Sequence, residues 1–207
     1  GIRAFHVMEF RRVLFRSSAA RHATSKIASA GDLFSIRSLG FRGEALASIA
    51  AVARVALQTR TESDELGTLI RYEGGELKEH KRTGGTRGTS VEVKDLFYNV
   101  PARLKFLKSP RAESASIGDY VARLVLSAPE IAVHFVSGGK TVYRSNGGGN
   151  MRDALLCIYG VAADRQLCPV AFDDGYLKIE GFVGTPELAR ANRSGQTITL
   201  NGRIIHS

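Results

Sequence analysis

Cysteine is nearly absent from the sequence, and no long hydrophobic run occurs in it. Cys157 and Cys168 are the only cysteines among 207 residues. They are too few for a disulfide framework and lack the paired spacing of a zinc site, so we expect two buried, reduced thiols in a cytoplasmic protein. No apolar stretch approaches the roughly 20 residues that a membrane span requires, and the first residues lack a secretory signal pattern. We therefore expect neither membrane insertion nor secretion.

An excess of basic residues is the main feature of the composition. The chain has 29 lysines and arginines against 20 acidic residues, which gives a formal net charge of +9. Such a charge permits a polyanion partner such as DNA, but it also fits any basic globular protein. Between Lys78 and Lys108 there are eight basic and three acidic residues. If DNA binds, we expect backbone contact without base reading, through Lys81, Arg82 and Arg87; the alternative is an ordinary solvated face.

The first 17 residues differ in pattern from the rest of the chain. Bulky apolar residues alternate with arginines there, without the period of a helix or a strand. The stretch is similar to a translated sequencing adapter joined to a truncated gene, so we exclude residues 1–17 from the fold prediction. The alternative is a basic N-terminal arm. Without its four arginines and one glutamate, the net charge falls from +9 to +6.

The remaining sequence alternates strand-like and helix-like segments, which predicts an α+β sandwich. Three consecutive glycines predict a linker at 146–150, between a domain at 18–145 and part of a second domain at 151–207. Apolar spacings of three and four residues predict helices, and alternation predicts strands. The expected helices are 44–52, 112–127 and 153–159; the expected strands are 55–59, 68–72, 89–94, 131–136 and 177–183, with a hairpin over 197–205.

The most informative segment is 39–46, LGFRGEAL, in which glycines precede a helix. Glycine lets the backbone approach a ligand closely, and the first amides of a helix have no partner within the helix. These amides and the helix dipole favour a phosphate, and Arg42 adds a positive charge. The alternative is an ordinary tight turn before a buried helix.

Two other stretches have unusual compositions. Residues 21–27, RHATSKI, place hydroxyls and cations close together. Their spacing matches neither the phosphate-binding loop that ends in Gly-Lys-Ser/Thr nor the three-glycine dinucleotide fingerprint, so a nucleotide site here must be of another type. Residues 96–107, LFYNVPARLKFL, include Phe97 and Tyr98. We expect these aromatic side chains to pack in the core; the alternative is contact with a ligand.

Residues 22–27 and 40–46 together closely resemble the MutL family of DNA mismatch repair proteins, within the GHKL ATPases that include gyrase, Hsp90 and histidine kinases. Residues 96–107 are similar to a second diagnostic stretch of that family, and Asn201-Gly202-Arg203 to another inside a second domain. The resemblance covers about residues 21–207 in the family's order. It implies a partial GHKL-type (Bergerat) sandwich followed by part of a βαβ-type, ribosomal-protein-like domain, as in MutL and gyrase.

The resemblance also implies a set of ATP-binding residues. These are Thr24, Ser25 and Lys26 in the lid that closes over ATP, Arg42, Gly43, Ala45 and Leu46 in the loop and helix start that hold the phosphates, and Thr89 on the strand that lines the adenine side.

The chain departs from the family in its catalytic residues. Complete members carry a glutamate that activates water, an asparagine that binds Mg²⁺ and an Asp-x-Gly-x-Gly stretch that reads adenine, and the sequence contains none of these. A lysine that the family adds to the γ-phosphate would lie beyond Ser207. We therefore expect no catalytic residue, no metal ligand and no ATP turnover in this chain, while the intact product is an ATPase that uses Mg²⁺.

The resemblance further implies a role in repair. The family couples mismatch recognition to strand incision, with DNA, a MutS-type recognition protein and a second copy of the chain as partners in the bacterial cytoplasm. One alternative is a DNA-binding module without nucleotide chemistry. Another is a different GHKL ATPase, which the stretch 96–107 disfavours.

Overall fold

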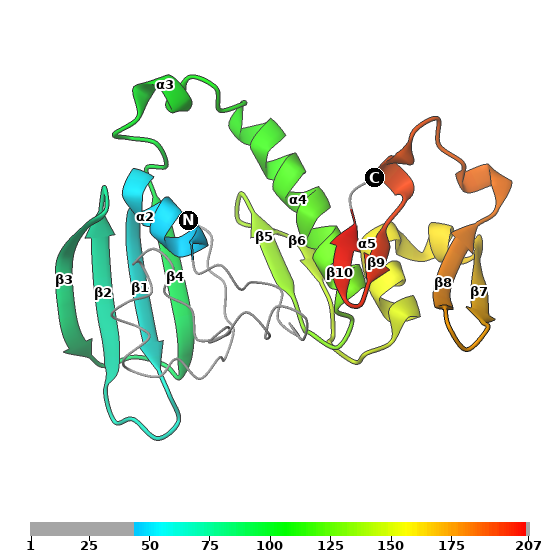
Figure 1. The fold of residues 1–207 in the computed structure, drawn as a ribbon, viewed down its shortest axis with the longest axis horizontal. Coiled ribbons are helices and arrows are strands. Elements are labelled where there is room, and N and C mark those ends of the chain that lie inside the picture. Colours follow the sequence, from blue (N-terminus) through cyan, green and yellow to red (C-terminus); the bar gives the residue numbers. More distant parts are fainter. Residues whose placement is uncertain (1–43, 206–207) are drawn as a thin grey trace. The chain divides into compact units, whose positions relative to one another are not determined.

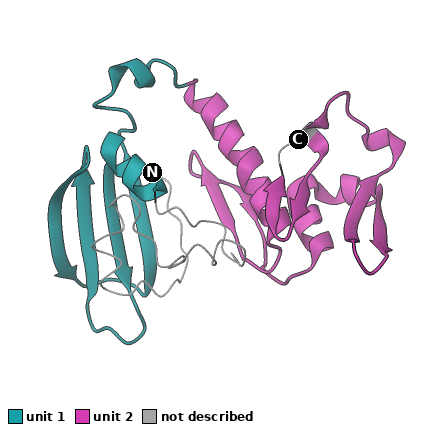
Figure 2. Ribbon diagram, in the orientation of Figure 1, with its two compact units in different colours: residues 1–107 teal, residues 108–207 magenta. Residues whose placement is uncertain are grey.

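The structure is a computed structural model that describes residues 44–205, and these belong to two compact units. The division lies between Leu107 and Lys108 (Figure 2). Residues 1–17, the hydroxyl-rich residues 21–27 and the loop residues 39–43 lie outside the described range. Each unit has its own hydrophobic core.

The first unit is an antiparallel sheet with a helix packed on one face (Figure 1). The strands lie in the order β3-β2-β1-β4, and helix α2 precedes them in the chain. The elements are α2 Ala45–Val52, β1 Arg54–Arg60, β2 Gly67–Glu73, β3 Glu76–Thr83, β4 Gly88–Lys94 and the short helix α3 Pro101–Leu104.

Alternation along β1 explains how the helix and the sheet pack together. Val55, Leu57 and Thr59 are buried, and the residues between them face the other side of the sheet. Leu57 packs against Ile70 of β2, and Val55 packs against Ala50 of α2. Because alanine has a short side chain, α2 lies close to the sheet, and this face forms the core of the unit.

Four of the expected elements are confirmed in this unit. The helix 44–52 is α2, and the strands 55–59, 68–72 and 89–94 are β1, β2 and β4. The sequence does not predict β3, because ELKEHKRT contains one large apolar residue, Leu77, and therefore shows no alternation. This strand forms because its backbone pairs with β2 from end to end, with one irregularity between Arg71 and Tyr72.

The second unit contains two longer helices and, among residues 108–205, three two-stranded antiparallel sheets. Val125 and Leu126 of one helix pack with Ala154 and Leu155 of the other to form its core. The elements are α4 Pro110–Ser127, β5 His134–Ser137, β6 Lys140–Arg144, α5 Met151–Asp164, β7 Leu167–Asp173, β8 Lys178–Gly184, the 3₁₀ turns η2 Pro186–Leu188 and η3 Arg193–Gly195, β9 Ile198–Leu200 and β10 Arg203–Ile205.

The expected hairpin and the long helix of this unit are confirmed. Strands β9 and β10 meet at Asn201 and Gly202, whose φ angles of 49° and 75° suit the tightest hairpin turn. Helix α4 begins two residues before the expected start, because the Ser109 hydroxyl accepts a hydrogen bond from the amide of Ala112 at 3.3 Å. The expected strand 177–183 is β8.

One helix and one strand of this unit differ in length from the expected elements, and two strands are not expected from the sequence. Helix α5 is longer than 153–159 and contains a kink at Gly160, where φ is 78°. The expected strand 131–136 begins only at His134. Strands β6 and β7 are not predicted by the sequence; in β7, Pro169 interrupts the strand pattern.

Two further expectations concern burial and domain limits. Cys157 is half-buried and Cys168 is exposed on β7, so the expectation of two buried thiols is wrong for Cys168. The core between α4 and α5 joins residues on both sides of 146–150, and the predicted domain boundary there stays a prediction. None of the helices within 44–205 is both long and apolar enough to cross a membrane.

Candidate functional site

Three residues of the predicted nucleotide site lie within the described structure: Ala45, Leu46 and Thr89. The other predicted residues lie outside the described range, and these are Thr24, Ser25, Lys26, Arg42 and Gly43. The described part of the predicted site therefore consists of the start of α2 and one position on β4.

The start of α2 presents backbone amides without intrahelical acceptors. Glu44 occupies the N-cap position, and its side chain makes no capping hydrogen bond. The amide of Ser48 donates to the carbonyl of Glu44 at 2.9 Å, which closes the first turn. The amides before Ser48, including those of Ala45 and Leu46, have no acceptor inside the helix. With the helix dipole they create a local positive potential that favours an anion.

The packing of α2 shows where its start lies on the sheet. Leu46, near the start, packs against the cluster that contains Leu57 of β1 as well as against the one that contains Val55. Ala50, one turn later, packs against Val55, nearer the beginning of the same strand. Helix and strand therefore run in opposite directions, and the start of α2 lies toward the Thr59 end of β1.

Thr89 lies at that same end of the sheet. It stands opposite Thr59 in the pairing of β4 with β1, and the two hydroxyl oxygens are 2.8 Å apart in a buried hydrogen bond. Thr89 is 7% exposed and Thr59 is 8% exposed. The face that α2 covers therefore changes from apolar at Leu57 to polar at this hydroxyl pair, toward the start of the helix. The resemblance to the MutL family selected Thr89 but did not indicate Thr59, which lies 30 residues away in the chain.

The chemistry of this corner suits an anionic ligand with a polar ring. Amides at a helix start bind phosphate oxygens, and hydroxyl groups both donate and accept hydrogen bonds. Within 44–205 no group of three histidine, cysteine, aspartate or glutamate side chains could hold a metal ion. Tyr72 packs against the core between α2 and β1. Because burial raises the pKa of its phenol, Tyr72 stays neutral at physiological pH. The described residues at this corner can therefore offer amide and hydroxyl hydrogen bonds to a ligand.

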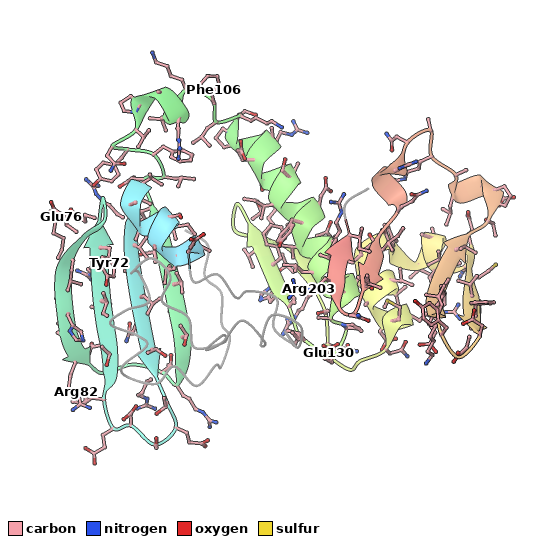
Figure 3. All side chains as sticks on the ribbon, viewed as in Figure 1. Tyr72, Glu76, Arg82, Phe106, Glu130 and Arg203 are labelled. Carbon is pink, nitrogen blue, oxygen red and sulfur yellow. The ribbon has the colours of Figure 1, made fainter. Side chains whose placement is uncertain are left out.

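The three cations predicted to contact DNA do not gather on one surface. Lys81 and Arg82 are neighbours on β3, so their side chains leave opposite faces of the strand. Lys81 forms an ion pair with Glu79 at 2.5 Å, and Arg87 with Glu62 at 2.6 Å. Arg82 is exposed and forms no ion pair with another residue of the described range; its side chain extends outward from the sheet (Figure 3).

The stretch 96–107 is more exposed than its aromatic content suggests. Tyr98 is 39% exposed and Phe106 is 87% exposed, and Phe106 extends away from the ribbon beside α3 (Figure 3). The expectation that these aromatics pack in the core is therefore wrong for Tyr98. Its ring instead lies 5.1 Å from the guanidinium carbon of Arg54, in a cation–π contact.

Comparison with known sequences points to DNA repair proteins. Residues 155–207 match the family described as DNA mismatch repair protein, C-terminal domain. The chain is 47% identical over 185 residues to the DNA mismatch repair protein MutL of Streptococcus sanguinis, and 48% identical over 187 residues to that of Limosilactobacillus fermentum. The alignments cover 89% and 90% of this chain. The chain spans only 29% of the length of each of these two relatives.

Comparison with solved structures supports the fold. The structure is similar to the Aquifex aeolicus MutL ATPase domain complexed with ADP, with a TM-score of 0.67 and 24% identity, over 87% of this chain and 67% of that one. It is also similar to the N-terminal domain of a DNA repair protein, with a TM-score of 0.73 and 22% identity, over 95% of this chain and 62% of that one. The expected α+β fold of the GHKL type, followed by a second domain, is thereby confirmed.

Proposed function

Because this chain belongs to the MutL family of DNA mismatch repair proteins, we propose that its first unit forms part of the ATP-binding site of the full-length protein. The observation that carries the proposal is the buried hydroxyl pair of Thr59 and Thr89, which lies toward the start of α2. Amides at the start of a helix suit the phosphates, because they have no acceptor inside the helix, and the hydroxyl pair suits the hydrogen-bonding edge of a base.

The proposed contacts follow from the geometry of α2. The Leu46 side chain packs on the sheet, so its backbone amide, together with that of Ala45, is the group available to a phosphate. The proposed ATP-binding residues are Ala45 and Leu46 through their amides, Arg42 and Gly43 beside the phosphates, Thr89 on the adenine side, and Thr24, Ser25 and Lys26 as a lid over the bound nucleotide.

The solved relative from Aquifex aeolicus contains ADP, which supports a nucleotide as the ligand. We propose that Mg²⁺ accompanies ATP in the intact protein. The described residues do not fit a metal site, because no cluster of metal-binding side chains occurs within 44–205. We further propose that this chain is without the family's water-activating glutamate and metal-binding asparagine and so does not turn over ATP, and that the full-length protein does.

In the full-length protein, ATP binding would close the lid, bring the N-terminal regions of two copies together and transmit a signal from mismatch recognition to strand incision. The proposed partners are DNA, a MutS-type recognition protein and a second copy, in the bacterial cytoplasm. Lys81, Arg82 and Arg87 remain the proposed DNA contacts. Arg82 is the strongest of them, because the carboxylates of Glu79 and Glu62 offset the other two cations.

Equilibrium binding of a non-hydrolysable ATP analogue to the full-length protein tests the proposal. We expect binding by the unaltered protein and about tenfold weaker binding by Arg42→Ala, the scale of one charge-assisted hydrogen bond. Arg111→Ala is the matched control, because it removes an exposed arginine of the second unit and leaves the proposed site intact. If the unaltered protein binds DNA but no nucleotide, the DNA-binding module without nucleotide chemistry is the better description.

A further inference from the structure

Helix α2 does not cap its own C-terminus. The residue that follows the helix, Ala53, is extended, with φ −146° and ψ 173°. Many helices end instead in a left-handed residue that folds the chain back onto the last carbonyls. Buried backbone carbonyls need donors. At this helix end Ala50 and Ala53 are buried, so their carbonyls need donors from elsewhere in the unit, whereas Ala51 is exposed.

Two segments of the first unit supply these donors, and we call them the C-terminal clamp: the β2–β3 turn at Gly74 and Gly75, and the loop 95–99. Four successive carbonyls at the end of α2 accept a hydrogen bond from them. The pairs are Gly75 N with Ala50 O at 2.8 Å, Asn99 Nδ2 with Ala51 O at 3.0 Å, Phe97 N with Val52 O at 2.7 Å and Gly74 N with Ala53 O at 3.3 Å.

The loop of the clamp is held in an uncommon conformation. Asp95 and Phe97 have φ angles of 52° and 65°, a left-handed region that a bulky residue such as phenylalanine seldom adopts. Arg54 ties the loop to β1, because its guanidinium forms an ion pair with Asp95 at 2.7 Å and lies over the ring of Tyr98. A Cβ atom at Gly74 would lie 2.8 Å from the Tyr98 hydroxyl, so loop and turn are in close contact.

Packing alone holds α2 weakly along its axis. The buried positions of its second half are occupied by small side chains, Ala50 and, directly after the helix, Ala53. Small side chains offer few interlocking contacts that would stop a helix from sliding or tilting. The helix has eight residues and is only about 12 Å long, so a displacement at its end moves its first amides as well.

We infer that Asn99 is a positioning residue for nucleotide binding. Its side-chain amide holds the carbonyl of Ala51, which keeps α2, and with it the start of the helix, in place on the sheet. This inference rests on the proposed nucleotide site. The sequence Phe-Tyr-Asn at 97–99 would then have a function besides aromatic packing, because it holds the C-terminal end of the helix whose N-terminal amides bind the phosphates.

Binding of ADP and of adenosine to the full-length protein tests the inference, because only ADP uses the start of α2. Asn99→Ala should weaken ADP binding about fivefold, the scale of one net hydrogen bond, by reducing the fraction of molecules with α2 in place. Adenosine binding should change less than about twofold. Asn99→Asp, which keeps the size but loses the donor, should weaken ADP binding at least as much.

The matched control is Asn146→Ala in the second unit, where an exposed asparagine donates to Asp153 at 3.3 Å; it should bind ADP like the unaltered protein. If the unaltered protein fails to bind ADP, the proposed function fails. If it binds ADP and both Asn99 variants bind equally well, the function stands and the positioning role is wrong. Equal weakening of ADP and adenosine also contradicts the inference, since it indicates a general loss of structure. Should circular dichroism show that Asn99→Ala is unfolded, Asn99→Asp decides.

Discussion

The buried hydrogen bond between Thr59 and Thr89 makes an energetic prediction that a double-mutant cycle can test. Valine keeps the size and β-branching of threonine and removes the hydroxyl, so strand propensity changes little. Thr59→Val leaves the Thr89 hydroxyl in a position that is 7% exposed. We expect this variant to lower the free energy of unfolding by about 1–2 kcal/mol, the cost of a buried polar group that loses its partner.

The same substitution at the partner residue, Thr89→Val, should lower the free energy of unfolding by a smaller amount. After Thr89→Val, the Thr59 hydroxyl can still donate to the carbonyl of Gly88, although at 3.4 Å this is a weak hydrogen bond. We expect a loss of about 1 kcal/mol. The double variant leaves neither hydroxyl without a partner, so its loss should be smaller than the sum of the two single losses. The coupling energy should be about 1 kcal/mol.

Urea unfolding followed by circular dichroism measures these free energies. Because the chain has two compact units, amide hydrogen exchange in β1 and β4 should be used to assign the transition to the first unit. A coupling energy within about 0.3 kcal/mol of zero is the range of independent sites, and it would refute the claim that the two hydroxyls form one buried pair.

Three further predictions concern a core position, a helix cap and a turn. Ile70→Ala, at a side chain 1% exposed, should lower the free energy of unfolding by about 2–5 kcal/mol. Leu77→Ala, at one 54% exposed, should change it by less than about 0.5 kcal/mol, and equal losses in urea would contradict this core. Asn150→Ala removes the acceptor for the second amide of α5 and should cost about 1 kcal/mol; an unchanged thermal midpoint of the second unit would speak against the cap. The backbone amides of Leu177 and Tyr176 donate to Asp174 and hold the pKa of its carboxyl below the ordinary value. The ionised Asp174 should therefore stabilise the fold above the unfolded-state pKa of about 4, and this stabilisation should be lost as the pH falls through the lower folded-state pKa. An NMR titration that gives the ordinary pKa for Asp174 would disprove this.

Much of the fold follows from local patterns, and the exceptions have physical causes. The alternation at 55–59 and the helical spacing of 112–127 predict β1 and α4, because burial of one face selects the period. Strand β3 has no such pattern, since its charged side chains are nearly all exposed and only pairing with β2 defines it. Strand β7 is not predicted for a different reason: it contains Pro169, and proline is seldom found inside a strand.

The candidate site could be predicted only in part. A glycine loop before a helix is a local signal that indicates a phosphate site, and the resemblance to the MutL family assigned Ala45 and Leu46 to it. The partner of Thr89 becomes visible only when the register of β1 with β4 is known, since Thr59 lies 30 residues away. Asn99 and the carbonyl that it holds are 48 residues apart. No pattern of neighbouring residues contains such a contact, so sequence reasoning could note the stretch but assigned its aromatics to the core.

Backbone amide exchange of the full-length protein, with and without ADP, tests whether the start of α2 and the Thr89 end of β4 bind the nucleotide together. If the start of α2 and the Thr89 end of β4 form one nucleotide site, ADP should slow exchange at residues 45–47 and at Thr89, and it should leave the β5–β6 hairpin unchanged. ADP binding without added protection at 45–47 and Thr89 would show that the nucleotide binds elsewhere and would contradict the proposed site.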